Sequence, residues 1–142
     1  FQADSNAVRV FNFKPQTRRL NAGSLCALTM KIVKINTDDI IDWDSFHDLF
    51  SKKFGFPKFY GKNMNAWIDC MTSLDSPDDG MTSIHTSKGE TIIIELENVS
   101  SLATRNREIY DAIIESSAFV NYRKIELGEP AVLTLSFHKT RT

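Results

Sequence analysis

One short segment of the sequence, residues 91–96, is apolar at almost every position: Thr-Ile-Ile-Ile-Glu-Leu. Three consecutive isoleucines favour an extended strand, because β-branched side chains pack well on a pleated surface and lose rotamer freedom in a helix. The run lacks the alternation of a strand with one face in water and is typical of strands in parallel sheets with helices on both sides. We therefore expect a buried parallel strand here, with helices covering both faces of its sheet.

Two other segments complete the predicted sheet. Residues 31–35 (Lys-Ile-Val-Lys-Ile) and 131–137 (Ala-Val-Leu-Thr-Leu-Ser-Phe) are rich in residues that favour strands. Long stretches with helical periodicity separate them from the central run, and parallel strands need crossovers of this length. The sequence therefore predicts an α/β fold, with a small three-stranded parallel sheet packed with about four helices.

The first two helices are predicted from apolar residues spaced three and four positions apart. One covers about 44–53; Asp42 or Asp44 can cap its start, and Gly55 ends it. The next begins after Asn63, whose side chain can accept from the free N–H groups of the first turn. Both helices lie in the crossover between the first two strands.

The second crossover is predicted to hold a helical stretch over about 100–120, interrupted near Arg105. A charged connection is expected over 122–129. The segment 75–90 shows no periodicity and contains several glycine, proline and hydroxyl residues, so we expect a long functional or mobile loop. His85 in this loop has no neighbouring metal-ligand residues and is expected to be exposed to solvent.

The length of the chain, 142 residues with 42% hydrophobic and 25% charged, is typical of one globular domain. Residues 1–29 are more polar, basic and irregular than the rest, and Met30 is a plausible natural start. We therefore predict an N-terminal extension over 1–29, vector-derived or otherwise non-native, and a single domain over 30–142. Within the extension, residues 8–13 alternate in polarity and could add an edge strand.

Cysteine content and charge limit the classes of function. Cys26 and Cys70 do not make a disulfide framework, so a reducing cytoplasm is expected. No apolar run approaches the roughly 20 residues that cross a bilayer, so we predict no membrane partner. The net charge is −1, but outside the extension 13 basic residues face 17 acidic ones. This acidic body argues against direct nucleic-acid binding and suits a basic protein partner.

Residues 56–71 predict a rigid turn that leads directly into a short helix. Pro57 fixes its own φ, Gly61 permits a tight or left-handed bend, and Asn63 caps the helix. The helix has one stripe that should face the core, made of Met64, Trp67, Cys70, Met71 and Leu74.

The same helix has a second stripe that must face outwards or towards a partner. It consists of Asn65, Ile68, Asp69 and Thr72, with Phe59 and Tyr60 at the entrance to the helix. A carboxylate beside aliphatic and aromatic side chains has two interpretations. It is either an ordinary solvated helix face or the centre of a protein interface, where aromatic side chains and fixed charges are enriched.

Residues 57–70 match the pattern Pro-x-aromatic-Tyr-Gly-x-Asn-x-(acidic or amide)-Ala-x-x-Asp-Cys. This pattern resembles the signature of the barstar family, small intracellular inhibitors of barnase-type ribonucleases. The resemblance covers about 30–137 through the order of elements, and it implies a three-stranded parallel sheet with about four helices. It also implies a basic ribonuclease or nuclease toxin as partner.

The resemblance assigns roles to individual residues. Asp69 matches the family's central aspartate, which meets arginine and histidine side chains of the nuclease through charge-assisted bonds. Glu115 aligns with a second acidic contact, and Gly61 and Asn63 shape the loop. The predicted partner-binding residues are Phe59, Tyr60, Gly61, Asn63, Asn65, Ile68, Asp69, Thr72, Leu74 and Glu115.

Four of these residues depart from the best-known inhibitor of the family. Asn65 lies where that inhibitor has an aspartate, Ile68 and Leu74 lie where it has tryptophans, and Phe59 replaces a tyrosine. Asn65 loses the charge but keeps hydrogen bonding, whereas Ile68 and Phe59 keep apolar contact and lose polar groups. An altered contact set is how one interface excludes another's enzyme, so the partner need not be barnase itself.

The sequence contains no motif for covalent catalysis, phosphate binding or metal ligation. We therefore predict no catalytic residues, no metal and no cofactor. Three interpretations remain. The first is a cytoplasmic ribonuclease inhibitor that acts as an antitoxin or immunity protein. The second is a binding module of the same fold with a non-nuclease regulatory partner, and the third is a small hydrolase that uses Asp69 and Glu115 as a carboxylate pair.

Overall fold

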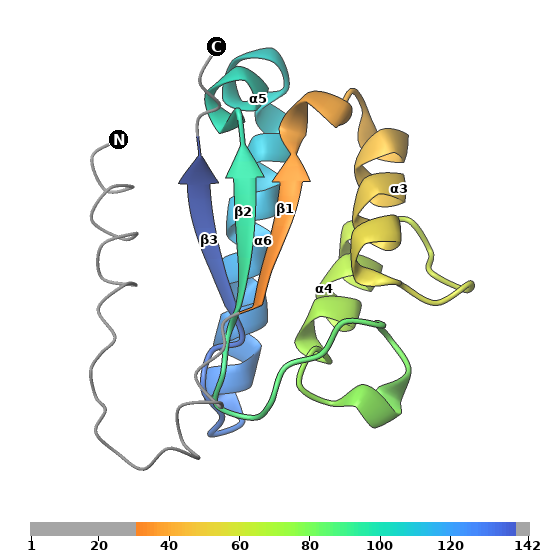
Figure 1. The fold of residues 1–142 in the computed structure, drawn as a ribbon, viewed down its shortest axis with the longest axis vertical. Helices are drawn as coiled ribbons and strands as arrows, with labels where there is room; N and C mark the ends of the chain where they lie inside the picture. The colour runs from red at the N-terminus through yellow and green to blue at the C-terminus, as the bar shows by residue number, and fades with distance from the viewer. Residues whose placement is uncertain (1–30, 139–142) are drawn as a thin grey trace.

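The structure, a computed structural model, describes residues 31–138 (Figure 1). Its three strands are parallel and lie in the order β1-β2-β3: Lys31–Asn36, Ile92–Glu97 and Leu133–His138. Its four α-helices are α3 (Trp43–Phe54), α4 (Met64–Thr72), α5 (Val99–Arg105) and α6 (Arg107–Glu126). Two short 3₁₀ turns are η2 (Thr37–Asp39) and η3 (Pro77–Asp79). The predicted fold class is confirmed.

The helices pack on one face of the sheet. In Figure 1, α6 runs behind the strands, α3 and α4 lie to their right, and no described helix lies in front of them. The core face carries Val33 and Ile35 from β1, Ile92, Ile94 and Leu96 from β2, and Leu133 from β3. The expectation of helices on both faces is therefore wrong for the described residues. Glu95 and Glu97 lie on the face that no described helix covers, and Ile93 on the same face is only 4% exposed.

Helix α3 begins and ends where the sequence predicts. Asp42 accepts from the N–H of Ser45 at 2.9 Å, and the Ser45 hydroxyl accepts from the N–H of Asp42 at 2.9 Å, which completes a capping box. Gly55 ends the helix with a φ of +69°. A Cβ at Gly55 would lie 1.9 Å from Oγ of Ser83, so the close approach of the 75–90 loop also requires glycine there.

The second crossover contains two helices that meet at Asn106, which confirms the predicted interruption near Arg105. The Asn106 side chain accepts from the N–H of Ile109 and so caps α6. The predicted connection over 122–129 is wrong, because α6 continues to Glu126. Its last turns are held by tertiary contacts that local sequence does not show, including a buried ion pair between Lys124 and Asp75.

The segment 75–90 is a loop except for η3, as predicted, and it is tied to the domain by backbone bonds. The N–H of Ser83 donates to the carbonyl of Phe54, and the N–H of Thr86 donates to that of Leu74. His85 is half-buried rather than exposed.

The predictions for residues 1–29, including the edge strand over 8–13, lie outside the described residues, as does Cys26. Within the described part of the chain, no helix is long and apolar enough to cross a membrane.

Candidate protein-binding surface

Helix α4 is held rigidly between its cap and the core. The Asn63 side chain accepts from the N–H of Ala66 at 2.9 Å, which satisfies one of the free donors of the first turn. Trp67, Cys70 and Met71 are buried on its inner face, as the spacing predicts. Burial, with the negative charge of Asp69 beside it, raises the pKa of the Cys70 thiol to about 11, so the thiol is protonated and unreactive at neutral pH.

The turn before α4 is built differently from the prediction at one position. Lys62, not Gly61, adopts the left-handed backbone, with a φ of 53°. Gly61 is needed for space instead, because a Cβ there would lie 3.1 Å from Nδ2 of Asn63. That amide nitrogen donates to the Gly61 carbonyl at 3.3 Å. The two residues thus fix the path of the loop into the helix.

The outer face of this unit presents most of the predicted partner-binding residues. Phe59 projects from the loop with 76% of its surface exposed, and Asn65 and Asp69 are exposed on α4. Ile68 and Thr72 are half-buried, and the Thr72 hydroxyl donates to the Ile68 carbonyl. The loop and the outer face of α4 therefore present one carboxylate, one amide and two apolar side chains, all at least partly accessible to solvent.

Leu74 is a correction. The residue is fully buried in the core, with an exposed fraction of 0%, so its side chain cannot reach a partner in the folded protein. Its position just after α4 continues the inner stripe of that helix rather than the outer one. The helix periodicity assigned Leu74 to the core, and the structure agrees with that assignment rather than with the one carried over from the resemblance.

Asp69 has a partner within the protein. Nη1 of Arg123, from the neighbouring helix α6, lies 3.1 Å from Oδ1 of Asp69, and the two side chains remain 58% (Asp69) and 40% (Arg123) exposed. Glu115 is exposed on the same helix, two turns before Arg123, and is not paired with Asp69 among the described side chains. The ion-pair partner of the Asp69 carboxylate in the described structure is therefore a cation, Arg123.

Tyr60 connects the loop to α3. Its hydroxyl lies 2.5 Å from Nδ1 of His47, a buried residue whose ring stacks on Trp43. Burial lowers the pKa of His47, and the positive charge of Lys62 lowers it further. A neutral imidazole can then accept the hydroxyl proton of Tyr60 at Nδ1. Tyr60 is half-buried, and its ring also contacts that of Phe56. Its main role is to hold the loop against α3.

Three residues of this region were missed by the sequence analysis: His47, Asp48 and Arg123. Nζ of Lys62 lies 2.8 Å from Oδ1 of Asp48 on α3, so the loop is also tied to that helix by an ion pair. The spacing of α3 places both Asp48 and Asp44 on its polar face, a signal that was present. The approach of Arg123 to α4 carries no local signal, because 54 positions separate it from Asp69.

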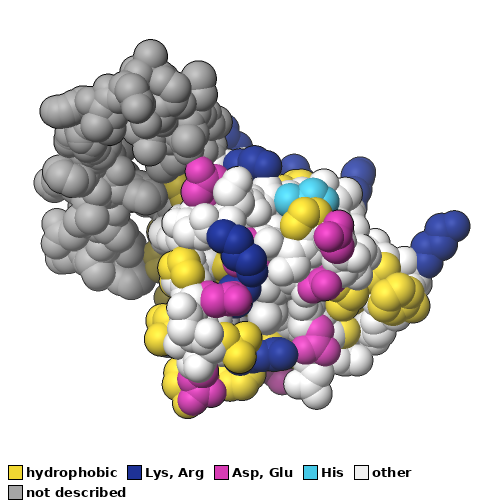
Figure 2. All heavy atoms as spheres, turned by 90° about the horizontal axis from the view of Figure 1, so that it is seen from below, with side chains coloured by type: hydrophobic (Ala, Val, Ile, Leu, Met, Phe, Trp, Pro, Cys, Tyr) yellow, Lys and Arg dark blue, Asp and Glu magenta, His cyan; other side chains and the backbone are white. Residues whose placement is uncertain are grey.

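The surface around α4 is mixed in charge rather than uniformly acidic. Asp44, Asp48 and Asp69 alternate with Lys62 and Arg123. Figure 2, which views the molecule from below, shows acidic, basic and hydrophobic side chains interspersed on the face that it displays. A partner of this surface must therefore offer cations to its carboxylates and tolerate two fixed cations beside them.

Comparison of the sequence with known protein families gives a match. The model of the family described as Barstar (barnase inhibitor) matches residues 30–124, which include β1, β2, the loop and all of α4. The chain belongs to the Barstar family. No curated protein matches the chain. Members of this family are described as inhibitors rather than enzymes, and their described target, barnase, is a ribonuclease.

Proposed function

We propose that the protein inhibits a ribonuclease by placing helix α4 and the preceding loop over the enzyme's basic active site. The observation that carries this proposal is the exposure of Asp69 on α4, at the position that matches the central aspartate of the family. The opposite face of α4 is packed in the core, so the carboxylate is presented on a rigid element. Rigid presentation lowers the entropy lost on binding.

The electrostatic basis is mimicry of a phosphate group. A ribonuclease active site holds phosphate with arginine, lysine or histidine side chains, and a carboxylate accepts charge-assisted hydrogen bonds from the same groups. Phe59 lies on the loop that leads into α4 and supplies exposed aromatic area, which is common at the centre of protein interfaces. Asp69 supplies the charge and Phe59 the apolar contact.

The surface suggests a nuclease other than barnase as the natural target. Arg123 places a cation 3.1 Å from the Asp69 carboxylate, so the partner needs an anion or a polar group nearby to accommodate it. Asn65 is an exposed amide where the best-known inhibitor carries an aspartate. Changes of this kind alter specificity through unfavourable contacts with the wrong enzyme.

We further propose that the protein acts as an antitoxin or immunity protein in a reducing cytoplasm, where it protects the cell that makes the nuclease. Cys70 supports this compartment, because it is a free, buried thiol in the described structure.

The proposal is tested by inhibition of RNA cleavage by a panel of barnase-type ribonucleases. Asp69→Ala should weaken inhibition of the responsive enzyme by about 2–5 kcal/mol, or roughly 30- to 5,000-fold, a range established on charge pairs such as those between barnase and barstar. Asp39→Ala, an exposed aspartate of η2, is the matched control and should inhibit like the wild type. Circular dichroism should show unchanged folding for both variants.

Two outcomes would contradict the proposal. If Asp69→Ala inhibited as well as the wild type, the inhibitory surface would lie elsewhere. If no basic ribonuclease were inhibited, and a non-nuclease protein bound in an Asp69-dependent way, the same surface would serve a regulatory binding module instead.

A further inference from the structure

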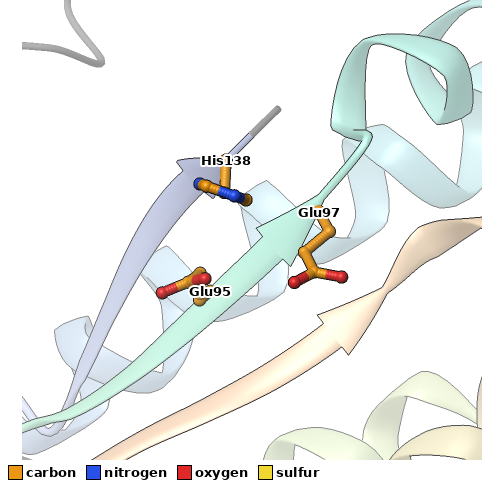
Figure 3. Close-up of side chains that lie close together, drawn as sticks. All are labelled: Glu95, Glu97 and His138. Atoms are coloured by element: carbon orange, nitrogen blue, oxygen red, sulfur yellow. The ribbon is translucent and has the colours of Figure 1, made fainter. Parts of the chain in front are cut away.

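The sheet face that no described helix covers carries three side chains with metal-binding groups. Glu95 and Glu97 project from β2 and His138 projects from β3, and Figure 3 shows the three side chains together at the carboxyl end of the strands. We propose that these residues bind a divalent first-row transition-metal ion of the Zn²⁺ type. This site is separate from the proposed nuclease-binding surface, which is formed by α4 and its loop.

The sheet register brings the three residues together. Glu97 pairs directly with His138 on the neighbouring strand, and adjacent strands lie about 4.8 Å apart. Glu95 is two positions before Glu97 and therefore projects from the same face of β2. The arrangement follows from backbone hydrogen bonding, which fixes the positions of all three side chains relative to one another.

The ligand atoms lie close enough to share one ion. One carboxylate oxygen from each glutamate and one ring nitrogen of His138 all lie within 4.8 Å of one another. Zinc bonds to nitrogen and oxygen ligands are about 2.0–2.2 Å long, so two ligands of one ion are separated by at most about 4.4 Å. Small rotations of exposed or half-buried side chains can supply the remaining few tenths of an ångström.

The three side chains are not engaged elsewhere. Among residues 31–138, no hydrogen bond or ion pair uses the side-chain oxygens of Glu95 or Glu97, or the ring nitrogens of His138. Two carboxylates on one face of a central strand repel each other, and a bound cation would remove that repulsion. The lone pairs needed for coordination are therefore available.

The ligand set favours a transition-metal ion over calcium or magnesium. Imidazole nitrogen suits zinc, iron, nickel and copper, whereas Ca²⁺ and Mg²⁺ select ligand sets made of oxygen alone. Three protein ligands leave one position of a tetrahedral ion for water.

Other groups on this face do not complete a competing site. Lys34 lies opposite Glu95 on β1, but no ion pair joins it to either glutamate in the described structure. Asn36 lies opposite Glu97, and its side-chain oxygen already accepts from the N–H of Asp38. The Lys34 side chain is exposed and can turn away from a bound metal ion.

The test is titration of the full chain with ZnCl₂ by isothermal calorimetry, alongside thermal unfolding with and without the ion. The wild type should bind one Zn²⁺ and unfold at a temperature several degrees higher in its presence. Mg²⁺ at the same concentration should have no effect. Glu97→Gln and His138→Gln should each raise the dissociation constant for Zn²⁺ at least tenfold.

Two controls separate this site from non-specific binding. His85→Gln removes a histidine of the 75–90 loop, and Glu108→Gln removes an exposed glutamate from the first turn of α6. Both should bind Zn²⁺ like the wild type. Absence of binding to the wild type, or equal binding by the wild type and the Glu97 and His138 variants, would overturn the proposal. Co²⁺ offers a second readout, because its visible absorption reports nitrogen and oxygen coordination without depending on stability.

Discussion

Arg123 and Asp69 form an ion pair that, under the proposed function, a nuclease must either displace or join. The pair is 3.1 Å long and both side chains are exposed enough to exchange partners with solvent groups. Exposed pairs contribute only about 0–1 kcal/mol to stability, since solvent screens them and ordering two long side chains costs entropy. The pair is therefore weak enough for a nuclease cation to compete for the carboxylate.

Replacement of Arg123 should accordingly strengthen inhibition. In Arg123→Gln, the nuclease no longer competes with an internal cation, and a like charge facing the basic active site is removed. We expect the inhibition constant to fall about 2- to 5-fold, which corresponds to the 0.5–1 kcal/mol of a surface pair. Arg107→Gln, which breaks the 3.1 Å pair with Asp111 on the same helix, should change nothing. Weaker inhibition by Arg123→Gln would mean that Arg123 positions Asp69 or contacts the partner itself.

The hydroxyl of Tyr60 should contribute to the free energy of unfolding rather than to the charge of the surface. In Tyr60→Phe, the buried Nδ1 of His47 loses its 2.5 Å partner, which costs about 1–2 kcal/mol because the ring nitrogen is left without a hydrogen bond. Tyr122→Phe is the matched control, since that hydroxyl bonds to Glu126 on an exposed helix surface. Urea unfolding should show a loss for the first variant and a change below about 0.5 kcal/mol for the second. Equal losses would contradict the assigned role of His47.

At the scale of elements, local sequence predicts starts and interruptions better than long-range contacts. Asp42, Asn63 and Asn106 each cap the helix that follows them. The capping bond spans only two or three positions, so a helix start can be recognised from the local sequence. The end of α6 was missed because the contacts of Lys124 come from the 75–90 loop and from Glu129. The absence of a described helix on the second face of the sheet was not predicted, because a buried apolar strand does not show what covers it: Ile93 on that face is itself buried.

Lys124 joins α6 to the 75–90 loop through a buried ion pair. Its Nζ lies 2.8 Å from Oδ1 of Asp75 and 2.7 Å from Oε1 of Glu129. Burial alone would raise the pKa of Asp75, but the hydrogen bond and charge of Lys124 outweigh it, with help from Lys88, and the pKa is lowered. The stability from this carboxylate is therefore present above its unfolded pKa of about 3.9 and is lost as the pH falls below that value.

Lys124→Met should remove this support and leave Asp75 buried without its main partner. We expect a loss of about 3–5 kcal/mol in the free energy of unfolding at neutral pH. The loss should shrink in acid, because burial then raises the pKa of Asp75 and the protonated carboxyl needs no cation. Lys88→Met is the control: that side chain is 58% exposed and lies 3.5 Å from Asp75, so its loss should cost under about 1 kcal/mol. Denaturant titrations of both variants between pH 7 and pH 4 test the prediction.

At the scale of the whole molecule, the candidate surface combines segments that are distant in the sequence. The signature in residues 57–70 predicts the loop, the cap and the outer face of α4, because these features are local. The same sequence could not show that α6 brings Arg123 to Asp69, or that parallel pairing sets His138 beside Glu97. Both contacts depend on crossover packing and strand register, which bring together residues more than 40 positions apart.

The net charge of the domain supplies one effect that no single contact provides. Residues 30–142, the predicted domain, carry 13 basic and 17 acidic residues, a net charge of −4 within a chain of net charge −1, although the surface around α4 itself is mixed. A field of this sign attracts a basic nuclease before contact and raises the association rate, whereas local pairs determine mainly the dissociation rate. Charges far from α4 should therefore affect the two rates differently.

The double variant Asp39→Lys and Glu108→Lys brings the net charge of the domain to zero by changes on η2 and the first turn of α6. We expect its association rate constant with the responsive nuclease to fall about 2- to 5-fold at low salt, and the difference from the wild type to vanish near 1 M salt, where the Debye length is about 3 Å. The dissociation rate should be unchanged, because neither residue lies on α4 or its loop. Stopped-flow measurements over a range of ionic strength separate the association and dissociation rates. The isosteric double variant Asp39→Asn and Glu108→Gln, which changes the net charge by half as much, is the graded control. A change confined to dissociation would show that one of these residues contacts the nuclease and that the net charge does not steer it.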